Sequence, residues 1–141
     1  MAKLIVSDLM TDKVYSIHQD EDLERLSELM NDIHIRHVPV VDDDGVVQGL
    51  VSQRDLLGSV LYAQRDIPQN DLREILKGMK VSEIMVKGIE TADPEQAIED
   101  AGAIMFDNKL GCLPIVENDK LVGILTEADF VKYLVDHAGE L

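Results

Sequence analysis

The chain has 141 residues, of which 45% are hydrophobic and 4% aromatic with no tryptophan, so we expect one domain or two half-domains around an aliphatic core. The net charge of −15, without a basic stripe, argues against binding to a nucleic acid backbone. One cysteine, no charged leader and no apolar run near the roughly 20 residues of a membrane span lead us to expect a soluble cytoplasmic protein.

The first part of the chain predicts strand, helix, strand, strand and helix. An apolar lead-in reaches Met10, and a brief strand is predicted at 14–17. The next helix carries apolar residues at helical spacing, and His18 or Asp20 could cap its start. Strands at 38–41 and 46–51 flank an acidic turn at 42–45, and a second helix opens at Asp55.

Residues 65–80 predict a connector. The preceding helix is expected to continue past residue 58, a polar break falls at 65–70, and a short helix is expected over 71–77. Nothing in this stretch indicates an independent domain. We therefore expect repeats at 1–64 and 81–141, joined by the connector.

The second part of the chain duplicates the first. Val-Ser-Asp-Leu-Met at 6–10 returns as Val-Ser-Glu-Ile-Met at 81–85, at a spacing of 75 that becomes 74 after the second acidic turn. Strands are predicted at 89–92, 113–116 and 121–125, and a last helix opens at Asp129. The intervening helix should start with Asp93 as its N-cap, Pro94 at its first position and Gln96 completing a capping box.

Two copies are too few for an open solenoid, which needs three or more. We therefore expect an α/β (α+β) fold of two β-α-β-β-α repeats that pack with pseudo-twofold symmetry. A closed pair of this kind places binding clefts at the interface between its repeats.

Each copy carries a Ser/Thr-x-x-Asp motif, here called the acid motif, before its last helix, at Ser52–Asp55 and Thr126–Asp129. The pattern is typical of a capping box, in which hydroxyl and carboxylate satisfy backbone N–H groups at a helix start. A ligand role is compatible with that structure. The carboxylate has about four acceptor sites and can also take a sugar diol, while free N–H groups at the helix start favour a phosphate.

The lead-in, the x-Leu/Val-Pro-Val/Ile-Val strand, the acidic turn and Gly-x-x-Ser/Thr-x-x-Asp, all present twice, resemble the CBS (cystathionine β-synthase) domain. The tandem arrangement is similar to a stand-alone CBS-domain pair. The resemblance implies a non-enzymatic regulatory module that binds AMP, ADP, ATP, S-adenosylmethionine or a related ligand between the repeats, with no obligatory cofactor. It also implies a homodimer, a disc of four repeats, and an unidentified protein target.

The resemblance further implies that each cleft combines the acid motif of one copy with the first strand and pre-proline segment of the other. One cleft would contain Thr126, Asp129, Ser16, Ile35, Arg36, His37 and Val38. The other would contain Ser52, Arg54, Asp55, Thr91, Leu110, Cys112 and Leu113. The apolar members would enclose adenine, and the carboxylates would hold ribose.

The two expected clefts differ in charge. Arg36 and His37 could contact a phosphate in the first, and Arg54 in the second. The alternatives are solvated or ion-paired arginines and a structural role for His37. The helices after the acid motifs are candidate dimer interfaces through Leu56, Leu57, Val60, Leu61, Phe130, Val131 and Leu134.

Other functions find less support in the sequence. The acidic turn lacks the downstream ligands of a calcium loop, and the four histidines show no metal-ligand spacing, so we expect no metal site. No catalytic constellation is recognisable. The alternative to a ligand sensor is a dimeric protein-interaction module that does not bind nucleotide.

Overall fold

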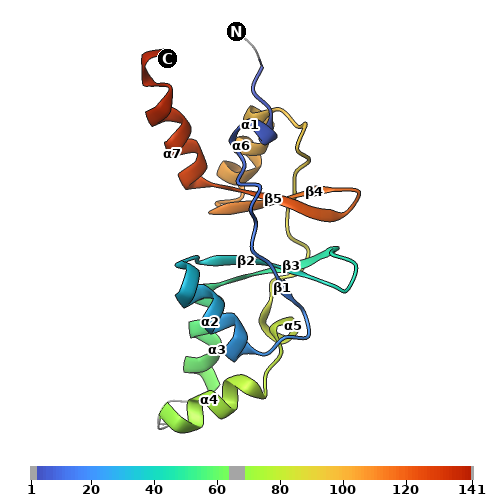
Figure 1. Ribbon diagram of the computed structural model, residues 1–141, viewed down its shortest axis with the longest axis vertical. Coiled ribbons are helices and arrows are strands. Elements are labelled where there is room, and N and C mark those ends of the chain that lie inside the picture. The colour runs from blue at the N-terminus through green and yellow to red at the C-terminus, as the bar shows by residue number, and fades with distance from the viewer. Residues whose placement is uncertain (1–2, 64–68, 141) are drawn as a thin grey trace. The chain divides into compact units, whose positions relative to one another are not determined.

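The computed structural model describes residues 3–63 and 69–140, and the chain divides into two compact units. The central unit is Tyr15–Ile89. The terminal unit joins Met1–Val14 to Glu90–Leu141. Both units contain short helices and a small sheet (Figure 1), which confirms the predicted mixed α/β class.

The central unit is built on a three-stranded sheet in the order β1-β2-β3. Strand β1 runs parallel to β2, and β2 runs antiparallel to β3. Helices α2 and α3 lie on the same side of this sheet (Figure 1). In chain order the elements are β1 (Ile17–His18), α2 (Leu23–Ile33), β2 (His37–Val41), β3 (Val47–Ser52), α3 (Gln53–Ala63), α4 (Gln69–Lys77) and α5 (Val81–Ile84).

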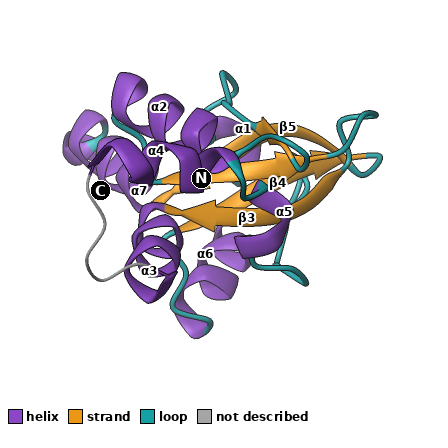
Figure 2. Cartoon of the chain, turned by 90° about the horizontal axis from the view of Figure 1, so that it is seen from below, coloured by secondary structure: helices purple, strands orange, loops and turns teal. Residues whose placement is uncertain are grey.

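The terminal unit contains the antiparallel pair β4-β5, and Ala92 bridges Ile115 of β4 in the parallel sense. This bridge corresponds to the pairing of Ile17 with Val40 in the central unit. The helices of this unit lie on one side of the strand pair in Figure 1, and Figure 2 shows the helices and strands from below. The elements are α1 (Val6–Leu9), α6 (Ile98–Asp107), β4 (Cys112–Glu117), β5 (Lys120–Thr126), α7 (Glu127–Asp136) and a 3-10 turn (Ala138–Glu140).

Each unit has its own aliphatic core because its helices and strands turn apolar faces toward each other. In the central unit, Leu23, Leu26 and Met30 recur at helical spacing on α2 and are buried against the sheet. Leu113 and Leu125 occupy the corresponding core of the terminal unit and are fully buried. The expected aliphatic core is therefore confirmed in both units.

The lead-in segments are exchanged between the two copies. Helix α1 belongs to the unit that contains the second copy, where the N–H groups of Val6 and Ser7 donate to the carbonyls of Gln96 and Pro94, both at 2.9 Å. Helix α5 belongs to the unit that contains the first copy, where the Val81 N–H donates to the Glu21 carbonyl at 2.8 Å. Each unit therefore combines the body of one copy with the lead-in of the other.

The expected N-cap of α6 is wrong. The helix starts after Ala97, and Asp93 instead closes a turn in which its side chain accepts from the Glu95 N–H at 2.8 Å. The carbonyls of Pro94 and Gln96 are thereby left to accept hydrogen bonds from α1. A helix that began at Pro94 would have used such carbonyls internally.

The start of α2 and the lengths of the first strands also differ from prediction. Asp22 caps α2 by accepting from the Arg25 N–H at 2.8 Å, so neither His18 nor Asp20 is its N-cap. The strand expected at 14–17 covers only Ile17–His18, and of the strand expected at 89–92 only Ala92 pairs.

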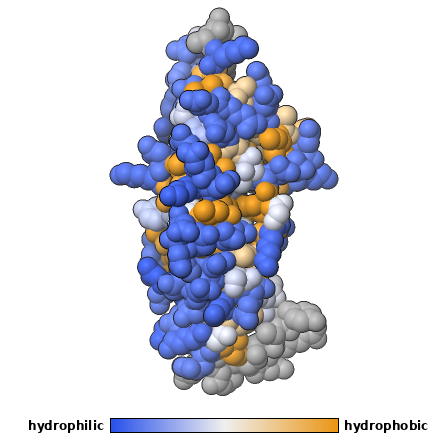
Figure 3. Space-filling view, turned by 90° about the vertical axis from the view of Figure 1, so that its right-hand side faces the viewer, coloured by the Kyte–Doolittle hydropathy of each residue, from blue (hydrophilic) through white to orange (hydrophobic). Residues whose placement is uncertain are grey.

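The surface is predominantly hydrophilic on the face shown in Figure 3, in agreement with the charge of −15. Leu56, expected at a dimer interface, is instead buried in the central core. The side chains of Val60 and Leu61, from the same expectation, are not described. Among the described residues, no helix combines the length and apolar character needed to cross a bilayer.

Candidate functional site

Both acid motifs form the start of a helix. At α7, the Thr126 N–H donates to Asp129 Oδ2 at 2.9 Å, and the Asp129 N–H donates to Thr126 Oγ1 at 3.3 Å. At α3, the Ser52 N–H donates to Asp55 Oδ2 at 2.9 Å, and the Asp55 N–H donates to Ser52 Oγ at 3.0 Å. The structural interpretation of both motifs as capping boxes is therefore confirmed.

These boxes leave binding capacity unused. A helix start carries backbone N–H groups without intrahelical partners and a partial positive charge, which together favour an anion. At Asp55, Oδ1 has no polar partner within the described part of the chain. The motif can thus cap the helix and still accept hydrogen bonds from a ligand.

A threonine that the sequence reasoning missed contacts the second motif. Thr11 Oγ1 donates to Asp129 Oδ1 at 3.0 Å. The duplication aligns Thr11 with Val86, which has no hydroxyl. The difference between Thr11 and Val86, which are 75 residues apart, was the sequence signal that could have pointed to this contact.

Within each unit, the pre-proline segment lies beside the acid motif of the same copy. The Gln53 N–H donates to the Arg36 carbonyl at 2.8 Å, and His37 pairs with Ser52. In the terminal unit, the Glu127 N–H donates to the Gly111 carbonyl at 3.3 Å. This adjacency follows from the antiparallel hairpin, in which the first strand starts at the same end of the sheet where the second strand finishes.

The residues predicted for each cleft are divided between the two units, so their cross-copy combination stays a prediction. The central unit contains Ser16, Ile35, Arg36, His37, Val38, Ser52, Arg54 and Asp55. The terminal unit contains Thr91, Leu110, Cys112, Leu113, Thr126 and Asp129.

Burial separates the apolar candidates into two groups. Val38 and Leu113 are completely buried in the two cores, and Cys112 is 2% exposed. Only the backbone of these three residues is therefore available to a ligand in this structure. Ile35 and Leu110 are partly exposed and can offer their side chains.

Arg36 and Arg54 are exposed cations close to the first acid motif. No ion pair joins either arginine to another residue among those described. Within the described residues, the ion-paired alternative therefore has no partner for either arginine. An anion contact at Arg36 or Arg54 stays a prediction.

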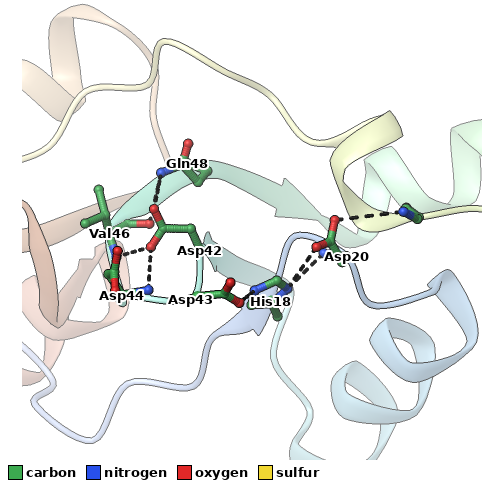
Figure 4. A network of polar contacts seen from close by, with 8 residues as sticks. His18, Asp20, Asp42, Asp43, Asp44, Val46 and Gln48 are labelled. Atoms are coloured by element: carbon green, nitrogen blue, oxygen red, sulfur yellow. Dashed lines mark hydrogen bonds and ion pairs between the residues drawn. The ribbon is translucent and has the colours of Figure 1, made fainter.

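The acidic turn is used by the hairpin itself (Figure 4). Asp42 Oδ1 accepts from the N–H groups of Asp44 and Val46 at 2.9 and 3.0 Å, and Oδ2 accepts from Gln48 Nε2 at 3.1 Å. Asp43 Oδ1 lies 2.6 Å from His18 Nε2. Over residues 3–63 and 69–140, no group of three or more His, Cys, Asp or Glu residues is arranged to hold a metal ion.

The thiol of Cys112 is poorly suited to covalent chemistry. Burial raises the pKa of Cys112 from its ordinary value of 9.0 to about 12. The thiolate is the nucleophilic form, and at neutral pH almost none is present at such a pKa.

The comparisons with known proteins agree with this architecture. The CBS domain family model matches residues 6–62 and 81–136. The chain is 28% identical over 135 residues to a homoserine O-acetyltransferase of Methanosalsum zhilinae, covering 95% of this chain but 25% of that enzyme. The chain therefore spans about a quarter of that relative.

Two solved structures are similar over nearly the whole chain. A Vibrio cholerae protein assigned by name to acetoin utilization (AcuB) is 29% identical, with a TM-score of 0.84, and the match covers 99% of this chain and 97% of that one. CBSX2, solved in complex with AMP, is 25% identical, with a TM-score of 0.78 and coverage of 95% and 98%. With both repeats matched by the family model, the chain belongs to the CBS domain family.

Proposed function

We propose that this protein is a non-enzymatic regulatory module that binds an adenosine-containing ligand, such as AMP, through its acid motifs. The observation that carries the proposal is the Asp55 carboxylate. It is fixed at the start of α3 by Ser52, and its Oδ1 has no polar partner among the described residues. The AMP complex of the similar protein CBSX2 supports the choice of ligand.

The chemistry of the motif matches a nucleotide at two points. A carboxylate accepts hydrogen bonds from both hydroxyls of a ribose, and the N–H groups of the helix start attract a phosphate. Arg36 and Arg54 are exposed and supply positive charge beside the first acid motif. Ile35 and Leu110 are the partly exposed apolar side chains, one for each expected cleft, that we assign to adenine contacts.

Ligand binding should stabilise the folded state by mass action, so thermal unfolding provides the test. We expect AMP, ADP, ATP or S-adenosylmethionine at millimolar concentration to raise the Tm of the full chain. Asp55→Ala and Asp129→Ala should each reduce that rise, measured against the ligand-free Tm of the same variant so that loss of the cap is subtracted.

Asp32→Ala is the matched control, because Asp32 is an exposed carboxylate outside both motifs. It should respond to ligand as the wild type does. No rise in Tm with any of these ligands would contradict the proposal. An equal rise in the wild type and both motif variants would show that nucleotide binds elsewhere.

A second candidate function is that of a dimeric interaction module that acts without nucleotide. Val131, Leu134 and Val135 favour it, because they share one face of α7 and are 51–70% exposed. Leu134→Glu should convert a dimer into a monomer in light scattering coupled to size exclusion. A wild-type chain that is already monomeric would contradict the dimer.

A further inference from the structure

Thr11 occupies one oxygen of the Asp129 carboxylate. Its Oγ1 donates to Asp129 Oδ1 at 3.0 Å, while Oδ2 accepts from the Thr126 N–H at 2.9 Å and lies 3.1 Å from Thr126 Oγ1. The backbone of Thr11 is held in place by two hydrogen bonds with Ile124, at 2.9 and 3.0 Å. Both oxygens of this carboxylate therefore already have partners within the terminal unit.

The Asp55 carboxylate lacks the equivalent contact. Val86 takes the position of Thr11 and pairs with Leu50, the counterpart of Ile124, at 2.9 and 3.0 Å. Valine has no hydroxyl to donate. Asp55 Oδ2 accepts from the Ser52 N–H, and Oδ1 has no polar partner within residues 3–63 and 69–140.

The difference matters for a ligand that presents two neighbouring hydroxyls. A carboxylate has roughly four acceptor positions, two on each oxygen, and a diol requires two of the four. At Asp55 about three positions are open, whereas at Asp129 about one is open if each short contact uses one position. A diol at Asp129 must therefore displace one existing contact, and the Thr11 hydroxyl is the one that lies outside the capping box.

We infer that Thr11 is a specificity-determining residue that weakens diol binding at Asp129 and leaves Asp55 as the stronger ribose site. The inference rests on the proposed nucleotide function and assigns the two motifs unequal affinities. The copies of this duplicated protein would then fill one after the other as ligand rises. The position that differs between the copies, Thr11 in one and Val86 in the other, sets the order in which the two sites fill.

The test isolates each motif in the full chain and measures AMP binding by calorimetry. Asp55→Ala leaves only the Asp129 site, and Asp129→Ala leaves only the Asp55 site. We expect the Asp55 site to bind about tenfold more tightly, as one charge-assisted hydrogen bond implies. Adding Thr11→Val to Asp55→Ala should tighten AMP binding about tenfold, and adding Val86→Thr to Asp129→Ala should weaken it.

Two further measurements exclude a general structural effect. Thr11→Ser keeps the hydroxyl and should retain the affinity of the parent variant. Replacing AMP by 2′-deoxy-AMP should cost more affinity at the Asp55 site than at the Asp129 site, and Thr11→Val should enlarge that cost at Asp129.

Unchanged or weaker binding on Thr11→Val would overturn the inference, since it would show that the hydroxyl is irrelevant or that it orients the carboxylate for the ligand. Equal affinities at the two sites would overturn it as well. In both cases the wild type still binds AMP, so the proposed function stands. Failure of the wild type to bind any of the adenosine ligands would overturn the function and the inference together.

Discussion

Gly49 of β3 is a buried position where one added methyl group should destabilise the protein. A Cβ built there lies 2.7 Å from the Val86 carbonyl oxygen and 2.9 Å from Met85 Sδ. The flexible Met85 side chain can move aside. The Val86 carbonyl cannot, because it accepts from the Leu50 N–H at 3.0 Å and the Val86 N–H donates back at 2.9 Å.

The size of the effect follows from these contacts. Relief of the clash requires loosening two backbone hydrogen bonds, each worth about 1 kcal/mol, and overpacking adds about 1–3 kcal/mol. We therefore expect Gly49→Ala to lower the free energy of unfolding by about 3 kcal/mol. For a chain of this length the Tm should fall by roughly 6–12 °C.

Urea unfolding followed by far-UV circular dichroism measures this change, and Gly58 provides a matched control. Gly58 lies within α3, and a Cβ there meets nothing within 4 Å. Gly58→Ala should therefore raise stability by up to about 1 kcal/mol through helix propensity. If the unfolding midpoint of Gly49→Ala matched that of the wild type, the segment around Val86 would not be seated on β3.

Other substitutions probe the cap, the core and the thiol. Thr126→Ala should cost about 1 kcal/mol of unfolding free energy by calorimetry, and a neutral result would contradict the capping box. In urea titrations, Leu113→Ala should cost about 2–5 kcal/mol because Leu113 is fully buried, while Leu57→Ala, at 55% exposure, should cost under about 0.5 kcal/mol. Since burial raises the pKa of Cys112 from 9.0 to about 12, its thiol ionises first in the unfolded chain, and Cys112 should lower stability as pH rises above 9. A Cys112→Ala control isolates that contribution, and rapid alkylation of the folded protein at pH 8 would refute the burial.

Features that depend on local sequence were predictable. Ser52 and Asp55, or Thr126 and Asp129, are three residues apart, so a helix start is enough to bring each hydroxyl and carboxylate together. The hairpins were also predictable, because an acidic turn separates two apolar runs in each copy, with Gly45 at a φ of +80° in the first and Asn118 and Asp119 at positive φ in the second. In these cases the pattern and the structure depend on the same few neighbouring residues.

Features that depend on distant segments were not predictable from one sequence. The exchange of α1 and α5 rests on backbone hydrogen bonds, such as that from Val6 to Gln96, which any residue except proline can donate. The bond between Thr11 and Asp129 joins residues 118 positions apart. Asp93 and Pro94 misled the prediction because the same residue types also close a turn.

The exchanged lead-ins make the two halves of the gene product interdependent for folding. A chain cut within residues 65–80 would yield two fragments, and each would carry the segment that covers the outer edge of the other's hairpin: Thr11 for β5 and Val86 for β3. Alone, each fragment would present that edge to solvent, where an unpaired strand invites aggregation. Together, they could reconstitute both sheets by complementation, so the covalent link at the connector matters less than the simultaneous presence of both halves.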